Sequence, residues 1–385
     1  MGFPVIVYIT FYFSLLIIFY SYVGYPFIVF LVSRVVNRTV HKAQVLPNIT
    51  ILISAYNEES VLAQTIENKL SIDYPSEKRE IIVISDGSTD KTDDIVGRYK
   101  KKKVTLFRQT PRAGKTSALN MAVPKAGGDI IVFADANSLY DSQALKQLAA
   151  NFADPEVGYV TGKMIYTEAD GTISGDGCSA YMKYENSLRS AESRLGSIVG
   201  VDGGVDAMRK RLYRPMKADQ LPDFVQPLMV VQQGYRVVYE PAAILQETAL
   251  RTDSDEYLMR VRVALRALWA LFDMRALLFC PDNMLFSWQL WSHKVLRYLC
   301  FIFLLSAFIS NLFLVRASSF YLLTMGIQSL AYLVALSAPL MVRFGNKSRL
   351  IAFIRYFALL NLACGHAFIK FISGKKQVIW APRKG

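Results

Sequence analysis

The segment at residues 49–58, ITILISAYNE, passes from a short apolar run to a polar turn. Its β-branched and aliphatic side chains predict a buried strand over Ile49–Ala55. A similar change from apolar to acidic residues recurs around 85–90, SDGSTD, and 133–137, FADAN, and a further acidic segment, PDF, stands at 222–224. An acidic residue at the end of a strand is well placed to bind a ligand. These segments therefore predict a sheet with a binding site along one edge.

Short apolar runs alternate with amphipathic stretches from residue 47 to about residue 249. We expect strands at 49–55, 81–85, 104–107, 130–134 and 235–239, and helices at 58–71, 91–99, 115–123 and 142–152. This alternation predicts an α/β fold, with a mostly parallel, Rossmann-like sheet and helices on both of its faces. Asp86 and Asp135 fall at the carboxyl ends of strands, where such sheets bind their ligands.

Apolar segments flank this central part on both sides. The N-terminal block at about 3–36 exceeds the ~20 residues that cross a bilayer, and it lacks the basic start and cleavage site of a signal peptide. We expect a retained anchor, with the basic residues after it on the cytoplasmic side of a bacterial-type inner or plasma membrane. Residues 298–315 and 320–341 are further candidate spans, and 284–296 suits the interface.

The stretch at 348–372 is also long enough to cross a membrane, but its flanks are basic and Arg355 lies within it. A crossing would leave one basic cluster outside, and arginine is costly at membrane depth. We expect this stretch to lie along the cytoplasmic face. The expected organisation is an anchor at 1–46, an α/β domain at 47–250, interfacial helices at 251–296, a transmembrane hairpin at 297–342, and an interfacial helix with a tail at 343–385.

The composition of the chain indicates which kinds of molecule it can bind. The 385 residues carry a net charge of +13, and 52% are hydrophobic. Basic side chains suit anionic lipid or an anionic small ligand. They are dispersed and accompany no nucleic-acid motif, so we expect no nucleic-acid partner. The four cysteines lack C-x-x-C spacing, which argues against a zinc site or a disulfide framework.

Several polar residues of the α/β part have both a chemical and a structural interpretation. Asp86 can accept hydrogen bonds from a base or ribose, or belong to an ordinary turn. Asp135 and Asn137 can hold a hard divalent cation that bridges a diphosphate, or form a turn that caps the next helix. Lys115, at a helix start, suits phosphate, or is a surface lysine. Asp223 can deprotonate a sugar hydroxyl, or cap a helix.

A basic set precedes the C-terminal apolar segments. Arg260, Arg262 and Arg266 stand before Trp269 on one amphipathic stretch, and Arg262 and Arg266 share a helix face. The set is either an interfacial helix seated on lipid or a diphosphate clamp beside an aromatic platform for a sugar.

Taken together, the ordered segments resemble the membrane-embedded inverting glycosyltransferases of family 2, the group of hyaluronan, cellulose and bacterial exopolysaccharide synthases. The resemblance covers nearly the whole chain. It implies a GT-A fold, a nucleotide-sugar donor such as a UDP-sugar, and Mg²⁺ or Mn²⁺. The donor-binding residues that it implies are Ala55, Tyr56, Glu58, Asp86, Lys115 and Asp135.

The resemblance also assigns the remaining roles. It implies metal binding by Asp135 and Asn137, and general base catalysis by Asp223. The acceptor or diphosphate site would comprise Arg260, Arg262, Arg266 and Trp269, and the gating segment would comprise Trp380 and Arg383. Three departures from the family pattern stand out: Asn137 replaces the second acid of D-x-D, Pro222 replaces an acid before Asp223, and Q-x-x-R-W is absent as such.

The expected function is transfer of a sugar to a growing polysaccharide at the membrane, with formation of a β-linkage. One alternative is a non-processive transferase that adds one sugar to a lipid-linked acceptor. Another is an inactive, transferase-like scaffold, against which the intact Asp86, Asp135 and Asp223 argue. The expected partners are the nucleotide-sugar donor, a saccharide or lipid-linked saccharide acceptor and membrane lipid, and an export partner is possible.

Overall fold

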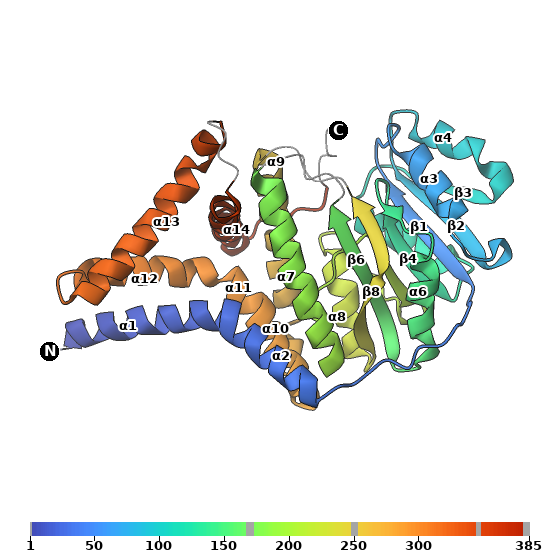
Figure 1. Ribbon diagram of the computed structural model, residues 1–385. Coiled ribbons are helices and arrows are strands. Elements are labelled where there is room, and N and C mark those ends of the chain that lie inside the picture. Colours follow the sequence, from blue (N-terminus) through green and yellow to red (C-terminus); the bar gives the residue numbers. More distant parts are fainter. Residues whose placement is uncertain (1, 167–172, 248–252, 344–347, 380–385) are drawn as a thin grey trace. The chain divides into compact units, whose positions relative to one another are not determined.

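The computed structural model describes residues 2–166, 173–247, 253–343 and 348–379. It divides into two compact units. Met1–Val32, Glu168–Glu185 and Ala249–Lys375 form a helical unit, while Ser33–Thr167, Asn186–Thr248 and Lys376–Gly385 form a unit built on a β-sheet (Figure 1). One long helix, α7 (Ile173–Leu195), contributes residues to both units.

The sheet unit contains eight strands in the order β3-β2-β1-β4-β7-β6-β8-β5. The strands are β1 (Ile49–Ala55), β2 (Arg79–Asp86), β3 (Val104–Gln109), β4 (Ile130–Asp135), β5 (Leu139–Tyr140), β6 (Val157–Tyr166), β7 (Asp206–Arg209) and β8 (Arg236–Glu247). β1 to β4 pair in parallel, as do β6 and β8, whereas β7 and β5 run antiparallel to their neighbours. The predicted α/β fold is confirmed, and β5, β6 and β7 are additions that sequence reasoning missed.

Helices cover both faces of this sheet. Because side chains alternate along a strand, Ile51 and Ile53 face one side and Leu52 the other. The first side packs against α3, α4 and α6 in one continuous apolar core, whereas α5 contacts β1 and β2, and α8 contacts β6 and β8. These helices are α3 (Leu62–Ser71), α4 (Thr92–Arg98), α5 (Lys115–Ala122), α6 (Ala144–Ala150) and α8 (Pro222–Gln232).

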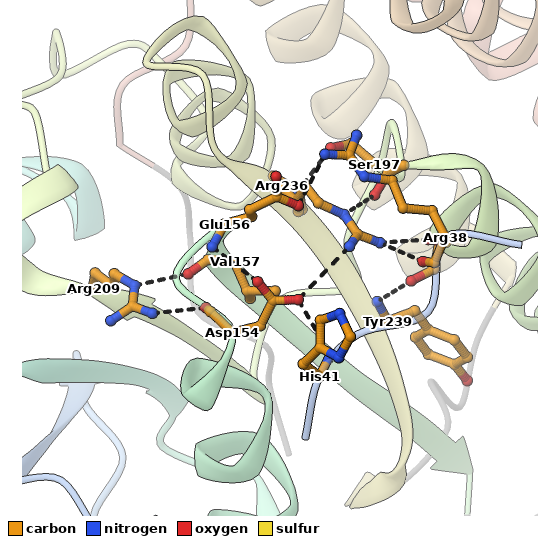
Figure 2. A network of polar contacts seen from close by, with 12 residues as sticks. Arg38, His41, Asp154, Glu156, Val157, Ser197, Arg209, Arg236 and Tyr239 are labelled. Carbon is orange, nitrogen blue, oxygen red and sulfur yellow. Dashed lines mark hydrogen bonds and ion pairs between the residues drawn. The ribbon is translucent and has the colours of Figure 1, made fainter. Parts of the chain in front are cut away.

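Within the sheet unit, a polar network holds residues 38–41 in place near the start of β8. Figure 2 shows Arg236, at the start of β8, beside Arg38, His41 and Asp154. Arg236 Nη2 donates to the Arg38 carbonyl at 2.8 Å, and the His41 backbone N–H donates to Asp154 Oδ2 at 3.2 Å. Arg236 and Asp154 are buried. Buried charges of opposite sign held by several hydrogen bonds make this attachment specific.

The helical unit begins with α1 (Gly2–Phe19) and α2 (Tyr25–Val35). Its later helices are α9 (Asp253–Asp273), α10 (Met284–Leu290), α11 (Leu296–Tyr298), α12 (Cys300–Leu314), α13 (Ser319–Arg343) and α14 (Arg349–Ile372). By length and composition, the segments Val5–Val35, Ser319–Ala338 and Arg349–Ile372 can cross a membrane, and Pro281–Tyr298 with Cys300–Leu314, bent by 58°, can form one broken span.

The surface of these helices is apolar where a soluble protein would be polar. On α13, Leu322, Leu323, Ile327, Leu330 and Leu333 are each more than 60% exposed. A continuous apolar row of this kind indicates membrane association. The expected in-plane position of 348–372 remains a prediction, because α14 is also long and apolar enough to span.

Candidate active site

The carboxyl ends of β1, β2 and β4 meet at one edge of the sheet. The parallel register places Ser54 opposite Asp135, and Ala55 opposite Ser85. Tyr56, Asp86 and Asp135 therefore leave the sheet at the same edge, as the sequence predicts. The Ala55 side chain is buried in the apolar core, so this residue can meet a ligand only through its backbone. The backbone N–H of Glu58 donates to Thr92 Oγ1 at 2.9 Å, which fixes the turn after β1.

Asp86 holds the loop that leads into α5. Its Oδ1 accepts hydrogen bonds from the backbone N–H groups of Ala113, at 2.8 Å, and Gly114, at 3.1 Å, and from Gln109 Nε2, at 2.5 Å. Gly114 has a φ of +90°, which an L side chain rarely adopts. The buried carboxylate thus orients the start of α5 and, with it, Lys115.

An aromatic and a cationic plane stack beside Asp86. The guanidinium carbon of Arg112 lies 3.4 Å from the centroid of the Tyr56 ring, and Arg112 Nε lies 3.6 Å from Asp86 Oδ2. Stacking on Tyr56 is the kind of contact that a planar base also makes.

Lys115 brings two of the predicted site residues together. Its Nζ lies 2.8 Å from Asp135 Oδ1 and 3.5 Å from Asp223 Oδ1. Burial alone would lower the pKa of Lys115, but the carboxylates of Asp135 and Asp223 raise it above its ordinary value. The ammonium therefore stays charged and neutralises part of the negative charge of these two acids.

A pair of glycines lies against both carboxylates. Asp223 is in the first turn of α8, and a Cβ added to Gly203 would lie 2.9 Å from its Cγ. A Cβ on Gly204 would lie 3.6 Å from Asp135 Oδ2. Both glycines have positive φ values, +76° and +82°. Glycine at both positions therefore lets the turn approach the two acids closely.

The residues at the end of β4 fit a hard cation in part. Asn137 donates through Nδ2 to Glu247 Oε1 at 3.3 Å, so its amide oxygen is the atom suited to a metal. Asp135 and Asn137 thus offer oxygen ligands, the type that Mg²⁺ and Mn²⁺ prefer. Within the described ranges, no group of three or more His, Cys, Asp or Glu side chains could hold a metal ion. The fit therefore requires further oxygens, such as those of a diphosphate.

Sequence reasoning missed one acidic residue beneath this site. Asp206, the first residue of β7, is fully buried. Burial, with Asp223 nearby, raises the pKa of Asp206 to about 7, although the hydroxyl of Thr161 opposes this shift by donating to the carboxylate. The only signal was the segment VDGGVDAMRK at 201–210, and aspartate is uncommon in strands.

The basic set at 260–269 belongs to the helical unit. On α9, Arg260 Nε donates to Glu256 Oε1 at 2.7 Å and its Nη2 to the Tyr356 hydroxyl at 2.6 Å. Trp269 Nε1 donates to the Lys375 carbonyl at 2.9 Å. Arg262 is half-buried and Arg266 is buried. The role of these residues at the acceptor or the diphosphate stays a prediction.

The helical unit also contains a partly open cavity of about 350 Å³. Aromatic side chains dominate its lining, with Arg260 and Arg297 among the charged groups; the tyrosines are Tyr22, Tyr181, Tyr184, Tyr298 and Tyr356. A cavity lined in this way suits a ligand with large apolar or ring surfaces.

The segment after α14 belongs to the sheet unit and reaches the start of α5. The Val378 carbonyl lies 3.1 Å from a Cβ built on Gly114, and Lys376 Nζ lies 2.5 Å from Asp219 Oδ2. The predicted gating residues Trp380 and Arg383 follow directly and lie outside the described residues.

Residues 50–212, which include Asp86, Lys115 and Asp135, match the model of glycosyl transferase family 2. These residues form a glycosyltransferase family 2 domain. The expected family is thereby confirmed. The matched residues include the three strands that meet at the candidate site.

Curated relatives agree with this family. The chain is 27% identical over 225 residues to a poly-β-1,6-N-acetyl-D-glucosamine synthase of Staphylococcus aureus, which covers 57% of this chain and 54% of that protein. It is 35% identical over 134 residues to the probable glycosyltransferase YdaM of Bacillus subtilis, over 33% of this chain and 32% of the relative. The chain thus matches about half the length of the synthase.

A solved structure extends the comparison over most of the chain. The mannosyltransferase of Pyrobaculum calidifontis, in complex with GDP-mannose and Mn²⁺, matches with a TM-score of 0.72 at 22% identity, over 93% of this chain and 97% of that one. This likeness establishes the fold, and the predicted GT-A type is confirmed.

Proposed function

We propose that this chain transfers a sugar from a nucleotide-sugar to a saccharide acceptor at a membrane, with inversion at the anomeric carbon. The observation that carries the proposal is the acidic pair beside Lys115: Asp135 Oδ1 at 2.8 Å and Asp223 Oδ1 at 3.5 Å from one ammonium. In the proposed reaction, one carboxylate of this pair serves the donor and the other serves the acceptor. Both carboxylates lie near one ammonium, so the two substrates can meet at the same place.

Each residue of the site has a separate role in the proposed reaction. Tyr56 and the Asp86 loop would receive the nucleoside, and Lys115 would move to the diphosphate as a point charge. Asp223 would take the proton of the attacking hydroxyl, as a general base. A cation at Asp135 and Asn137 would neutralise charge on the departing nucleoside diphosphate. A single in-line attack inverts the anomeric carbon, so an α-linked donor gives a β-linkage, and orientation and electrostatics supply most of the acceleration.

The acceptor that we favour is a growing polysaccharide, because one relative is named as a synthase of a β-linked polymer. The relative's name also favours a donor of N-acetylglucosamine, carried as a UDP-sugar. A second candidate is a single transfer to a lipid-linked acceptor. The aromatic cavity of the helical unit, with Arg260 in its lining, supports it because such a lining suits an amphiphile.

We place the transfer reaction in a cytoplasmic domain at about 47–250, anchored by the preceding helices in a bacterial-type inner or plasma membrane. The apolar helices support membrane anchoring, and the basic residues that follow α2 support the cytoplasmic side. Export of a polymer by this chain or by a partner protein is part of the same proposal.

A donor screen tests the proposal. The purified full chain, in lipid nanodiscs with Mg²⁺ or Mn²⁺, is offered UDP- and GDP-sugars, and released nucleotide and product length are measured. We expect the protein to use one donor. Long products would identify a polymerase, and single additions would identify the lipid-linked alternative. The proposal would be contradicted if none of the donors released nucleotide in the presence of saccharide and lipid-linked acceptors.

The cation is tested separately. Excess chelator should abolish nucleotide release, and Asn137→Asp should tighten Mn²⁺ binding in the presence of nucleoside diphosphate, because it adds a charged oxygen ligand. Binding is measured by electron paramagnetic resonance of free Mn²⁺, which needs no turnover. Full activity in chelator would rule the cation out.

A further inference from the structure

Asp206 is a buried carboxylate that the proposed reaction does not use. It pairs with Phe133 of β4 and Thr161 of β6 in the sheet, so its side chain lies on the same face as theirs. Its Oδ2 accepts from the Tyr159 hydroxyl at 3.0 Å and its Oδ1 from the Thr161 hydroxyl. No Lys or Arg of the described residues forms an ion pair with it. Burying a carboxylate with hydroxyl partners alone is costly, which calls for a function.

The charged groups around Asp206 are those of the candidate site. Gly203 and Gly204, which lead into Asp206, lie against Asp223 and Asp135 respectively, and Asp206 pairs with Phe133, two residues before Asp135. At this place in the sheet, burial and Asp223 raise the pKa of Asp206, and Asp206 adds to the raised pKa of Lys115. The acidic residue Asp202 adds to the same field, and it is itself paired with Arg189. The groups that interact with Asp206 from the neighbouring elements are Tyr159 and Thr161 of β6, Tyr140 of β5, Asp223 of α8, Lys115 of α5 and Asp202.

We propose that Asp206 is a positioning residue for sugar transfer, whose buried negative charge acts through Asp223 and Lys115. A negative charge behind Asp223 strengthens that carboxylate as a proton acceptor, since a base gains strength with its proton affinity. The same charge adds to the attraction that Asp135 and Asp223 exert on the Lys115 ammonium. The proposal rests on the proposed function of the site.

The charge of Asp206 changes within the working range of pH. With a pKa of about 7, Asp206 is neutral in mildly acidic solution and charged above neutrality. The strengthening of Asp223 should therefore appear as pH rises through about 7. The rate of transfer should rise over the same interval, on top of any titration of Asp223 itself.

The test compares Asp206→Asn with Tyr159→Phe. Asp206→Asn preserves size and removes the charge, so we expect kcat at about pH 8 to fall roughly 10-fold, while the rise near neutral pH flattens and the KM for donor changes by less than about 2-fold. Tyr159→Phe keeps the charge but removes a hydrogen bond to it, so the rise should move to higher pH. A purely structural role for Asp206 moves neither profile.

An infrared measurement completes the test without turnover. The wild type should show a protonated-carboxyl band that disappears between about pH 6 and pH 8, and Asp206→Asn should lack this change. Unaltered pH profiles in both variants, or an infrared change that persists in Asp206→Asn, would overturn the inference. Absence of turnover in the wild type would instead contradict the proposed function, and the infrared result would still decide whether Asp206 titrates near neutrality.

Discussion

Asp223 is the single side chain on which the proposed chemistry depends most. It lies in the first turn of α8, half-buried and 3.5 Å from the Lys115 ammonium. Replacing it by asparagine removes the proton acceptor and preserves the shape of the site. We expect Asp223→Asn to lower kcat at least ~100-fold, the lower range for a general base, while the affinity for donor is retained.

Steady-state kinetics and donor titration of the variant separate these two effects. The control is Asp73→Asn, because Asp73 is an exposed aspartate paired with Lys146, and this variant should turn over normally. Near-normal turnover of Asp223→Asn would remove this residue from the role of base.

Asp206 also links stability to pH. Its pKa is about 7 in the folded protein, against 3.8 as the reference value. Between these pH values the folded state binds a proton that the unfolded state has lost, so stability falls as pH rises through this window. Asp206→Asn removes the effect. We expect the variant to be more stable than the wild type at about pH 8, by up to ~4 kcal/mol.

Thermal unfolding in detergent, followed at about pH 4 and pH 8, measures this difference. The gain in the melting temperature of Asp206→Asn should be present at pH 8 and small at pH 4. A gain of equal size at both pH values would show that removal of the carboxylate acts through packing and not through its charge.

The glycine turn before β7 keeps space for the Asp223 carboxylate. A Cβ on Gly203 would lie 2.9 Å from Asp223 Cγ, and the φ of +76° is strained for any L residue. Gly203→Ala should therefore displace the Asp223 carboxylate and lower kcat by roughly 100-fold, in addition to a loss of stability of about 1–2 kcal/mol.

Gly234→Ala is the matched control for this turn. Gly234 has a similar φ of +81°, but a Cβ built there meets no atom within 4 Å. This variant should lose comparable stability and retain its kcat, as measured by thermal unfolding and nucleotide release. Equal activities of the two alanine variants would show that Gly203 serves only the backbone.

The path of the whole chain through the membrane depends on α14. Its ends are basic, and Arg355 lies within it, so we expect it to lie in the plane of the cytoplasmic face. A single cysteine at Lys384, in a background free of the four native cysteines, should then be protected from a membrane-impermeant thiol reagent added to intact cells.

A cysteine at Ala317, between α12 and α13, is the opposite control. If α12 and α13 form a hairpin, this turn lies outside and should react. Reaction at Lys384 under the same conditions would mean that α14 crosses, as its length and composition permit, and would remove residues 380–385 from the cytoplasmic site.

Sequence alone predicted the elements whose signals are local. The strands at 49–55 and 130–134 are continuous apolar runs of strand length, and the observed β1 and β4 begin at the same residues. The positions of Asp86 and Asp135 followed from those strands, because a residue that ends a parallel strand lies at the ligand-binding edge. The family resemblance rested on the same local segments and was confirmed.

Tertiary structure decided what depends on strand order. β7 has four residues with an acid at its start, so no local pattern announces it, and its insertion between β4 and β6 places Asp206 beneath the candidate site. The approach of Lys115 to both Asp135 and Asp223 likewise follows from packing α5 and α8 on the sheet. Such contacts join residues far apart in the chain, and burial and charge there are set by neighbours that a local sequence pattern does not contain.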